Sequence, residues 1–287
     1  MKKIFVRSIA IVLLVIVLIY GGIIAWFISN ETSIVFHPDY TTRSLGTPPD
    51  SLHLNFKPVT LTTSDKVAIK GWEIISPKAD TSATWILFFH GNAGNVSDMG
   101  YPQRYAGWAG LGYNTLSMDY RGFGASEGKP TEKGLYVDAQ TAYNYLVNDK
   151  GVTPSNIVIY GYSLGTGIAT ELATKVPAKA LVLEGAYTSI PDIGTELYPF
   201  LPINWMASNK FENKSKITKI NTPVLFLHAK DDAQIPFAHG QKLFALAKEP
   251  KKFVELTGGH INAQFVDREK MYGNLQEFIA IDHQKVK

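Results

Sequence analysis

The stretch IVIYGYSLGTGIATE, from Ile157 to Glu171, decides the fold of this chain. Its first residues, Ile157 to Tyr160, form an apolar run of the length typical of a buried parallel strand. Gly161 ends that run, and apolar residues then recur at helical spacing from Ile168 to Val176. The stretch therefore predicts a buried strand, a tight turn and an amphipathic helix.

The turn carries the pattern G-x-S-x-G, with Ser163 between Gly161 and Gly165. This is the pattern of a nucleophile elbow, in which a serine hydroxyl stands out above the sheet. Both glycines are expected to be necessary, because a β-carbon at either position would strike the backbone of so sharp a turn. A second match surrounds Ser126, but a Gly-rich loop precedes it and Pro130 follows where a helix should begin. We predict that Ser163 is a nucleophile and that Ser126 is a loop residue.

A Rossmann-type sheet also contains tight strand-to-helix turns and is the alternative interpretation of this stretch. Gly165 and Gly167 do not form its dinucleotide fingerprint, and no G-K-[ST] phosphate loop follows. The chain contains no cysteine, which excludes thiolate nucleophiles, iron–sulfur clusters and Cys-ligated zinc. The net charge is only +3, without a basic stripe. We therefore expect no cofactor, no metal and no nucleic acid partner.

Apolar runs alternate with helical patterns through most of the chain, which predicts an α/β fold with a mostly parallel sheet covered on both faces. Two alternating runs between Val59 and Ile75 flank the turn Thr63 to Lys66 and predict an antiparallel hairpin before this pattern begins. The functional loops should lie at the carboxyl ends of the parallel strands. Besides the strand that leads to Ser163, the expected strands are Trp85–Phe89, Asn114–Met118, Ala180–Leu183, Val224–Leu227 and Phe253–Leu256.

The N-terminal segment predicts a membrane anchor. Ile9 to Ile28 is a run of twenty residues without a charge, long enough for a helix to cross a bilayer. No small-residue cleavage site follows it, which favours an uncleaved signal anchor over a cleaved signal peptide. Lys2, Lys3 and Arg7 precede the run and predict a cytoplasmic N-terminus, with the catalytic part on the periplasmic or other outer side. The expected segments are a transmembrane anchor at 1–29, a connector at 30–54 and an α/β domain at 55–287.

A serine hydroxyl is a weak nucleophile, so Ser163 requires a general base and a carboxylate that orients the base. His260 follows two glycines directly after the last expected strand, on a loop that brings its ring to the top of the sheet. We predict that His260 is the base. Three other histidines follow Ser163, at a strand end, at a helix start and in the polar tail: His228, His239 and His283.

The carboxylate is less well determined by the residue pattern alone. Asp231 and Asp232 both follow the strand Val224–Leu227, and only one of them can orient the imidazole. The other is expected to be an ordinary solvated loop residue. Asp192 lies in a different loop and Glu184 lies at the end of the preceding strand, and both are further candidates.

Acyl transfer also requires backbone N–H groups that point at the developing oxyanion. Leu164 follows the nucleophile at the start of a helix and is expected to provide one N–H group. Asn92, in the loop HGNAGN after the strand Trp85–Phe89, is expected to provide the second. The alternative for this loop is a glycine-rich turn with no catalytic role.

Taken in order, these motifs resemble the α/β-hydrolase superfamily, most closely its membrane-associated branch that includes acyl-protein thioesterases (depalmitoylases). In that branch the acid occupies the pattern D-x-x-[IV]-P, which Asp232 to Pro236 match. The resemblance implies a triad of Ser163, Asp232 and His260, with Asn92 and Leu164 as the oxyanion pair. The motifs that carry it are HGNAGN at 90–95, DYRGFGASEG at 119–128, GYSLG at 161–165, LEGAYTS at 183–189, PVLFLHAKDDAQIP at 223–236 and GGHIN at 258–262.

The depalmitoylases attach to the cytosolic face through lipidated N-terminal cysteines. This chain departs from them, because it contains no cysteine and is expected to carry a spanning helix with its catalytic part on the outer side. We therefore expect a membrane-anchored serine hydrolase of carboxylic esters or thioesters, acting on a small-molecule or lipid-like acyl substrate. A peptidase of the same fold is an alternative, in which Glu184 would anchor a charged peptide terminus. A non-catalytic binding protein on the same scaffold is the second alternative.

The segment Tyr187 to Thr222 is too long for a simple connection between strands. It predicts a small cap above Ser163. Large apolar residues are concentrated in it, and we expect most of them to pack against the sheet and some to line an acyl pocket.

Overall fold

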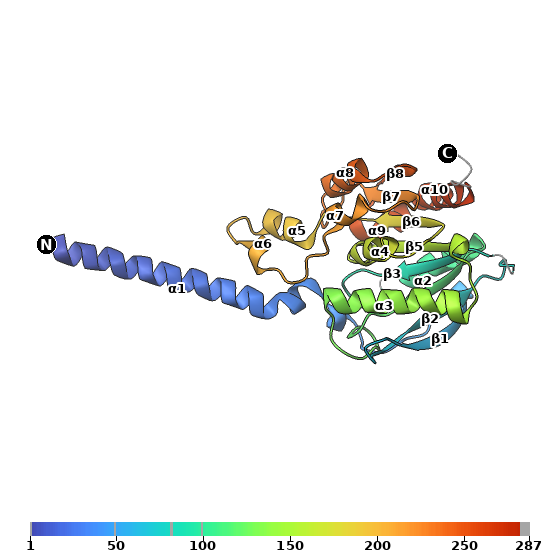
Figure 1. The fold of residues 1–287 in the computed structure, drawn as a ribbon, viewed down its shortest axis with the longest axis horizontal. Helices are drawn as coiled ribbons and strands as arrows, with labels where there is room; N and C mark the ends of the chain where they lie inside the picture. Colours follow the sequence, from blue (N-terminus) through green and yellow to red (C-terminus); the bar gives the residue numbers. More distant parts are fainter. Residues whose placement is uncertain (1, 49, 81–82, 99, 282–287) are drawn as a thin grey trace.

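The computed structural model describes residues 2–48, 50–80, 83–98 and 100–281, and an eight-stranded sheet forms its centre (Figure 1). The strand order is β1-β2-β4-β3-β5-β6-β7-β8, so β1 and β8 are the two open edges. β1 pairs with β2, and β2 with β4, in antiparallel fashion, whereas all other pairs are parallel. The mostly parallel sheet and the N-terminal hairpin predicted from the sequence are therefore confirmed. The strands are β1 Asn55–Thr62, β2 Ala68–Ile75, β3 Trp85–Phe89, β4 Asn114–Met118, β5 Ile157–Tyr162, β6 Ala180–Glu184, β7 Val224–Ala229 and β8 Lys251–Leu256.

Some strands are longer than their apolar runs. β5 includes Gly161 and Tyr162, because these residues still pair with Phe89 on one side and Glu184 on the other. Backbone pairing thus carries the strands past the last apolar residue and up to the loops that hold the candidate site.

Helices cover both faces of the sheet (Figure 1). On one face, α3 and α4 bury Leu135, Ile168 and Leu172 against the strands. On the other face, α2 and α10 contribute Trp108 and Leu275 to a second apolar cluster. The helices are α1 Lys2–Val35, α2 Tyr101–Gly110, α3 Glu132–Asn144, α4 Gly165–Ala173, α5 Ile190–Leu197, α6 Ile203–Met206, α7 Asn213–Ile217, α8 Phe237–Leu246, α9 Gly259–Val266 and α10 Arg268–Ala280.

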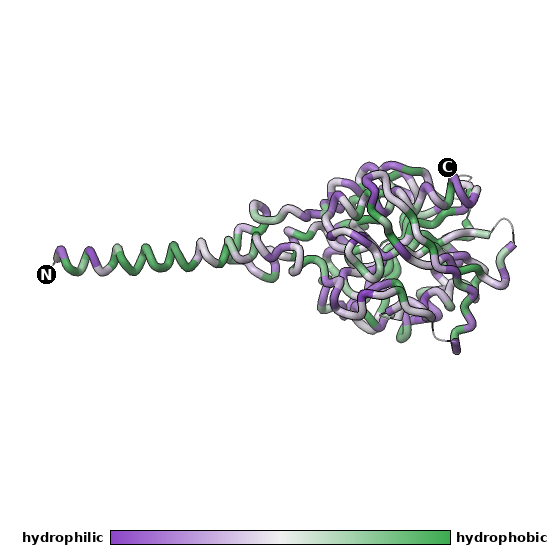
Figure 2. Tube along the Cα trace, turned by 90° about the horizontal axis from the view of Figure 1, so that it is seen from below, coloured by the Kyte–Doolittle hydropathy of each residue, from purple (hydrophilic) through white to green (hydrophobic). Residues whose placement is uncertain are grey.

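The helix α1 projects away from the α/β body, and Figure 2 shows a long apolar stretch along it. It is long and apolar enough to cross a membrane, and its apolar window is not buried against the rest of the chain. The helix runs on to Val35, beyond the expected boundary at Asn30. Directly after it, Phe36 is buried between the rings of Phe123 and Phe211, so the connector begins inside the core.

The segment between β6 and β7 contains the short helices α5, α6 and α7. The helices α5 and α6 lie on the side of the body from which α1 extends (Figure 1). Because this segment follows the carboxyl end of β6, α1 and the segment share the edge of the sheet where the functional loops are expected.

Candidate active site

The turn between β5 and α4 has the conformation of a nucleophile elbow. Ser163 adopts a φ of 53°, in the left-handed region that non-glycine residues rarely occupy. A β-carbon on Gly161 would lie 2.4 Å from the carbonyl oxygen of Gly165, and one on Gly165 would lie 2.0 Å from that of Phe89. Both glycines are therefore sterically required, and the end of β3 lies directly against the start of α4.

Ser163, His260 and Asp232 form a continuous hydrogen-bonded chain. The Ser163 Oγ lies 2.8 Å from His260 Nε2, and His260 Nδ1 lies 2.7 Å from Asp232 Oδ2. The three side chains come from the elbow, from the first turn of α9 and from the loop after β7. His260 thus lies at a helix start and not on the free loop that the sequence suggested. All three residues are largely buried.

The carboxylate of Asp232 is held on both of its oxygens. Oδ1 accepts the backbone N–H groups of Gln234 and Ile235 at 2.9 and 2.8 Å, while Oδ2 faces His260. Burial alone would raise the pKa of Asp232, but the hydrogen bond from His260, electrostatic attraction to that ring and the Ile235 N–H outweigh burial and lower it. Asp232 therefore remains an anion, the form that orients an imidazole.

Asp231 does not reach the imidazole but supports the segment before it. Its carboxylate accepts the backbone N–H groups of Gly258 and Gly259 at 3.2 and 3.0 Å. The Gly259 N–H is the main cause that lowers the pKa of Asp231. Sequence reasoning missed this role, because Asp231 was expected to be a solvated loop carboxylate.

The two further acid candidates have other partners. Asp192 pairs with Lys214 at 3.1 Å. Glu184 is buried, accepts a hydrogen bond from Arg104 Nη2 at 2.9 Å and accepts a second from the Tyr160 hydroxyl at 2.6 Å. Neither carboxylate is paired with His260.

The remaining serine and histidine candidates are also engaged elsewhere. Ser126 lies in a loop, as predicted, and its Oγ accepts the Lys70 N–H and donates to the Asp119 carbonyl. His228 is buried with its Nε2 3.0 Å from the Ile235 carbonyl, and burial lowers its pKa. His239 is buried with its Nδ1 2.8 Å from the Thr188 hydroxyl. His283 lies outside the described residues.

A layer of buried side chains, formed by Tyr162, Arg104 and Glu184, packs against His260. The Tyr162 ring stacks on the His260 ring at 5.3 Å, and its hydroxyl donates to the His260 carbonyl at 3.0 Å. The Arg104 guanidinium lies 4.5 Å from the centre of the Tyr162 ring and is paired with Glu184. No local sequence pattern indicates this layer, because Arg104 and Glu184 are separated by 80 positions.

One candidate oxyanion donor lies within the elbow and the other in the loop after β3. Leu164 precedes the first residue of α4, and Asn92 follows β3. The neighbouring Gly91 N–H is occupied by the Tyr101 hydroxyl at 3.0 Å. Within the described residues, the backbone N–H groups of Leu164 and Asn92 donate no hydrogen bond.

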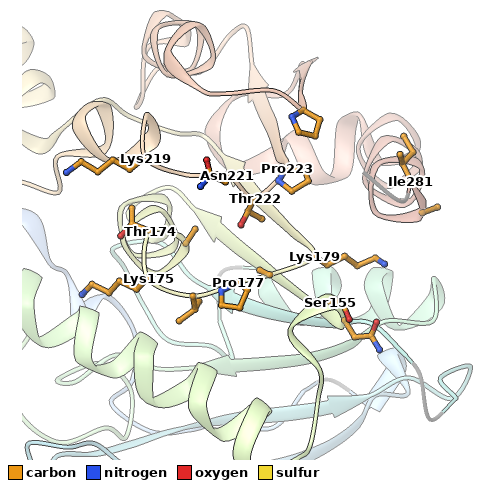
Figure 3. A pocket seen from close by; sticks show the side chains of 16 residues that line it. Ser155, Thr174, Lys175, Pro177, Lys179, Lys219, Asn221, Thr222, Pro223 and Ile281 are labelled. Carbon is orange, nitrogen blue, oxygen red and sulfur yellow. The ribbon is translucent and has the colours of Figure 1, made fainter. Parts of the chain in front are cut away.

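A large surface cavity of about 980 Å³ lies away from this constellation (Figure 3). Its lining residues Asn156, Lys179 and Pro223 directly precede β5, β6 and β7. The cavity is therefore at the amino ends of the strands, whereas Ser163, His260 and Asp232 lie at the carboxyl ends. None of the predicted site residues lines it.

Comparison with known proteins places the chain in a family. Residues 80–216 match a family model described as serine aminopeptidase, S33. The α/β-hydrolase domain-containing protein WAV2 of Arabidopsis thaliana is 32% identical, over 84% of this chain and 85% of that protein. The lysophosphatidylserine lipase ABHD12 of Danio rerio is 35% identical, over 68% of this chain and 54% of that protein.

The fold is also similar to solved structures. The Pyrococcus furiosus esterase Pf2001 superimposes with a TM-score of 0.69 at 19% identity, over 85% of this chain and 98% of that one. With the sheet order, the elbow and these relatives taken together, the chain belongs to the α/β-hydrolase superfamily, in its membrane-associated branch, and is a hydrolase.

Proposed function

We propose that this hydrolase is a membrane-anchored serine enzyme that cleaves carboxylic esters or thioesters, with Ser163, His260 and Asp232 as its catalytic triad. The observation that carries the proposal is the chain of two hydrogen bonds, of 2.8 and 2.7 Å, that joins the three side chains. This is the arrangement in which a histidine activates a serine and a carboxylate fixes the histidine tautomer.

The residues perform the reaction in two stages. His260 Nε2 takes the Ser163 hydroxyl proton while Oγ attacks the acyl carbon, and the N–H groups of Leu164 and Asn92 stabilise the oxyanion. The intermediate collapses, His260 protonates the departing alcohol or thiol, and the acyl group remains on Ser163. A water molecule, deprotonated by His260, then attacks the acyl-enzyme and releases the carboxylic acid.

The substrate is proposed to be lipid-like. One relative is named a lysophosphatidylserine lipase, and a structural neighbour is named an esterase, so both names indicate acyl esters. Ile190 and Ile193 of α5 are partly buried and pack against the same apolar cluster as α3 and α4. We propose that the cap, residues 187–222, adds an apolar wall to the acyl site.

A peptidase is the second candidate, favoured by the description of the matching family model. Glu184 was its expected anchor for a charged peptide terminus. That carboxylate is buried and already bound by Arg104 and Tyr160. The ester and thioester reaction requires no such anchor and is therefore preferred. A purely binding function would leave the Ser163–His260–Asp232 chain without a purpose.

The membrane arrangement is part of the proposal. Residues 1–29 are proposed to form the anchor, 30–54 a connector and 55–287 the hydrolase domain. The length and apolar character of α1 support the anchor. The basic residues before its apolar run support a cytoplasmic N-terminus, with the domain on the outer side.

The test uses the full chain in detergent with p-nitrophenyl esters, thioesters and peptide amides. We expect turnover of esters and thioesters and covalent labelling of Ser163 by a fluorophosphonate. Medium acyl chains should be preferred to acetyl, since each buried methylene contributes about 0.8 kcal/mol. Cleavage of amides alone would favour the peptidase, absence of labelling would favour a binding protein, and kcat/KM falling steadily from acetyl to octanoyl would remove the acyl pocket.

A further inference from the structure

The end of the cap exposes large apolar side chains. Leu197, Phe200 and Trp205 are 65%, 62% and 75% exposed, and Tyr198 is also exposed. We call these four residues the cap tip. They do not pack the cap onto the sheet, as most apolar cap residues were expected to do. A cluster of this kind on a protein surface marks a site of contact with a partner protein or a membrane.

The cap tip lies along α1. The Tyr20 hydroxyl donates to the Phe200 carbonyl at 2.6 Å, and the rings of Phe27 and Tyr198 meet edge to face at 5.2 Å. Farther along the helix, the Glu31 carboxylate accepts the backbone N–H groups of Ser208 and Asn209, both at 2.8 Å. The cap is therefore attached to α1 at three levels, and Figure 1 shows α6 beside the helix.

The depth of these contacts follows from helix geometry. A helix that begins to cross the hydrocarbon layer after Arg7 needs about 20 residues and leaves it near Phe27. At a rise of 1.5 Å per residue, Tyr20 lies roughly 10 Å on the membrane side of Phe27. The Phe200 carbonyl is bonded to Tyr20, so the cap tip reaches the same depth. A protein surface at that level meets lipid rather than water.

Paired lysines elsewhere in the cap give little attraction to anionic headgroups. Lys214 is paired with Asp192, and Lys216 is paired with Glu171 at 2.8 Å. Trp205 and Tyr198 are the residue types that gather at the boundary between headgroups and acyl chains.

We propose that the cap tip is inserted into the lipid leaflet beside α1, which holds the carboxyl edge of the sheet, and with it Ser163, toward the membrane. This inference rests on the membrane anchor of the proposed function and adds a second membrane contact. The cap tip thus contacts a phospholipid bilayer and enters it to the depth that an interfacial amphipathic helix reaches.

The test measures tryptophan quenching in the full chain, reconstituted in phosphatidylcholine vesicles. W26F removes the exposed tryptophan of α1 and leaves Trp205 as the exposed one, because the other three are buried: Trp72, Trp85 and Trp108. The emission of Trp205 is the difference between the fluorescence of W26F and that of W26F/W205F. Doxyl-labelled phosphatidylcholine should quench about half of this emission, and aqueous iodide should quench little of it. F200W in the W26F/W205F background moves the reporter and should give the same result. I281W in that background is the control at the far end of the body, and iodide should quench it.

Quenching of Trp205 by iodide but not by doxyl lipid would overturn the inference, since the tip would then lie in water. Quenching by neither reagent would also overturn it and indicate cover by protein, such as a second copy. Carbonate extraction of the same samples separates the two proposals. Release of the full chain from membranes refutes the anchor, whereas retention with a water-exposed Trp205 refutes only the inserted tip.

Discussion

The backbone N–H of His37 donates a hydrogen bond to the carbonyl oxygen of Asn92 at 2.7 Å. The Gly94 N–H returns one to the His37 carbonyl at 3.3 Å, and the Asn92 side-chain amide donates to the Val35 carbonyl at 3.3 Å. The end of α1 therefore restrains the loop that carries a proposed oxyanion donor. The N-terminal apolar helix and the proposed site are therefore physically continuous in this chain.

Asn92→Pro should lower kcat by about 10²–10³, because proline lacks the backbone N–H that is proposed to bind the oxyanion. Asn92→Ala keeps that N–H and should retain most of the activity. Ester hydrolysis at saturating substrate compares the two variants, and thermal unfolding verifies that both are folded. Equal activity of two folded variants would show that the second donor lies elsewhere.

Ser163→Ala should abolish turnover and fluorophosphonate labelling, since the hydroxyl on the elbow is the proposed nucleophile. Ser126→Ala is the matched control, because Ser126 has the same flanking pattern but is bonded to Lys70 and Asp119 in a loop. Intact-protein mass spectrometry after labelling distinguishes them. An adduct on Ser163→Ala together with its loss in Ser126→Ala would reverse the assignment.

Asp232→Asn should lower kcat by about 10⁴, as loss of the orienting carboxylate does in a well-studied triad. Asp231→Asn should be mild, because its amide oxygen still accepts the Gly258 or Gly259 N–H. Asp231→Ala removes both bonds and should fall between these two variants. The kcat values of the three variants give the ranking, and a larger effect at Asp231 than at Asp232 would contradict the proposed acid.

Stability should respond to pH through Asp119. Burial raises its pKa to about 8, and only one of its oxygens is bonded, to the Val96 N–H at 2.7 Å. Nearby His90 gives no compensating charge, because burial lowers its pKa to about 3. A carboxyl whose pKa is raised on folding stabilises the fold most below its unfolded pKa of 3.8, and this contribution disappears as the pH rises through 8.

Asp119→Asn stays neutral, so its Tm relative to the unmodified chain should rise by several degrees between pH 5 and pH 9. Thermal unfolding of both proteins across this range measures the difference. A difference independent of pH would mean that Asp119 is not held in its protonated form.

A reporter that works only outside the cytoplasm should be active when it is fused after Lys287. The reason is that Lys2, Lys3 and Arg7 are expected to keep the N-terminus in the cytoplasm. Alkaline phosphatase, which requires an oxidising compartment, and a cytoplasm-dependent fluorescent protein form the matched pair. A signal from the cytoplasmic reporter alone would refute the orientation.

The parts of the fold that follow from local patterns were predictable from the sequence. Apolar runs identified the strands, and the G-x-S-x-G pattern with its following helix identified the elbow at Ser163. Contacts between distant segments were not predictable, because no local pattern encodes them. Arg104 below Tyr162, Asp231 at the Gly258–Gly259 turn and His37 beside Asn92 are of this kind.

The extent of α1 shows the same limit. Polar residues from Asn30 onward suggested a connector, yet the helix continues to Val35. Its Glu31 finds its partners in the cap, at Ser208 and Asn209, which the sequence around Glu31 does not reveal.

The two open edges of the sheet bear on whether copies of this protein associate with one another. An unpaired strand invites another strand to join it. β1 presents Lys57 and Pro58, and proline offers no N–H to an incoming chain. β8 carries Lys252 and Glu255 with charged side chains in contact with water. Both edges therefore disfavour extension of the sheet from one molecule to the next.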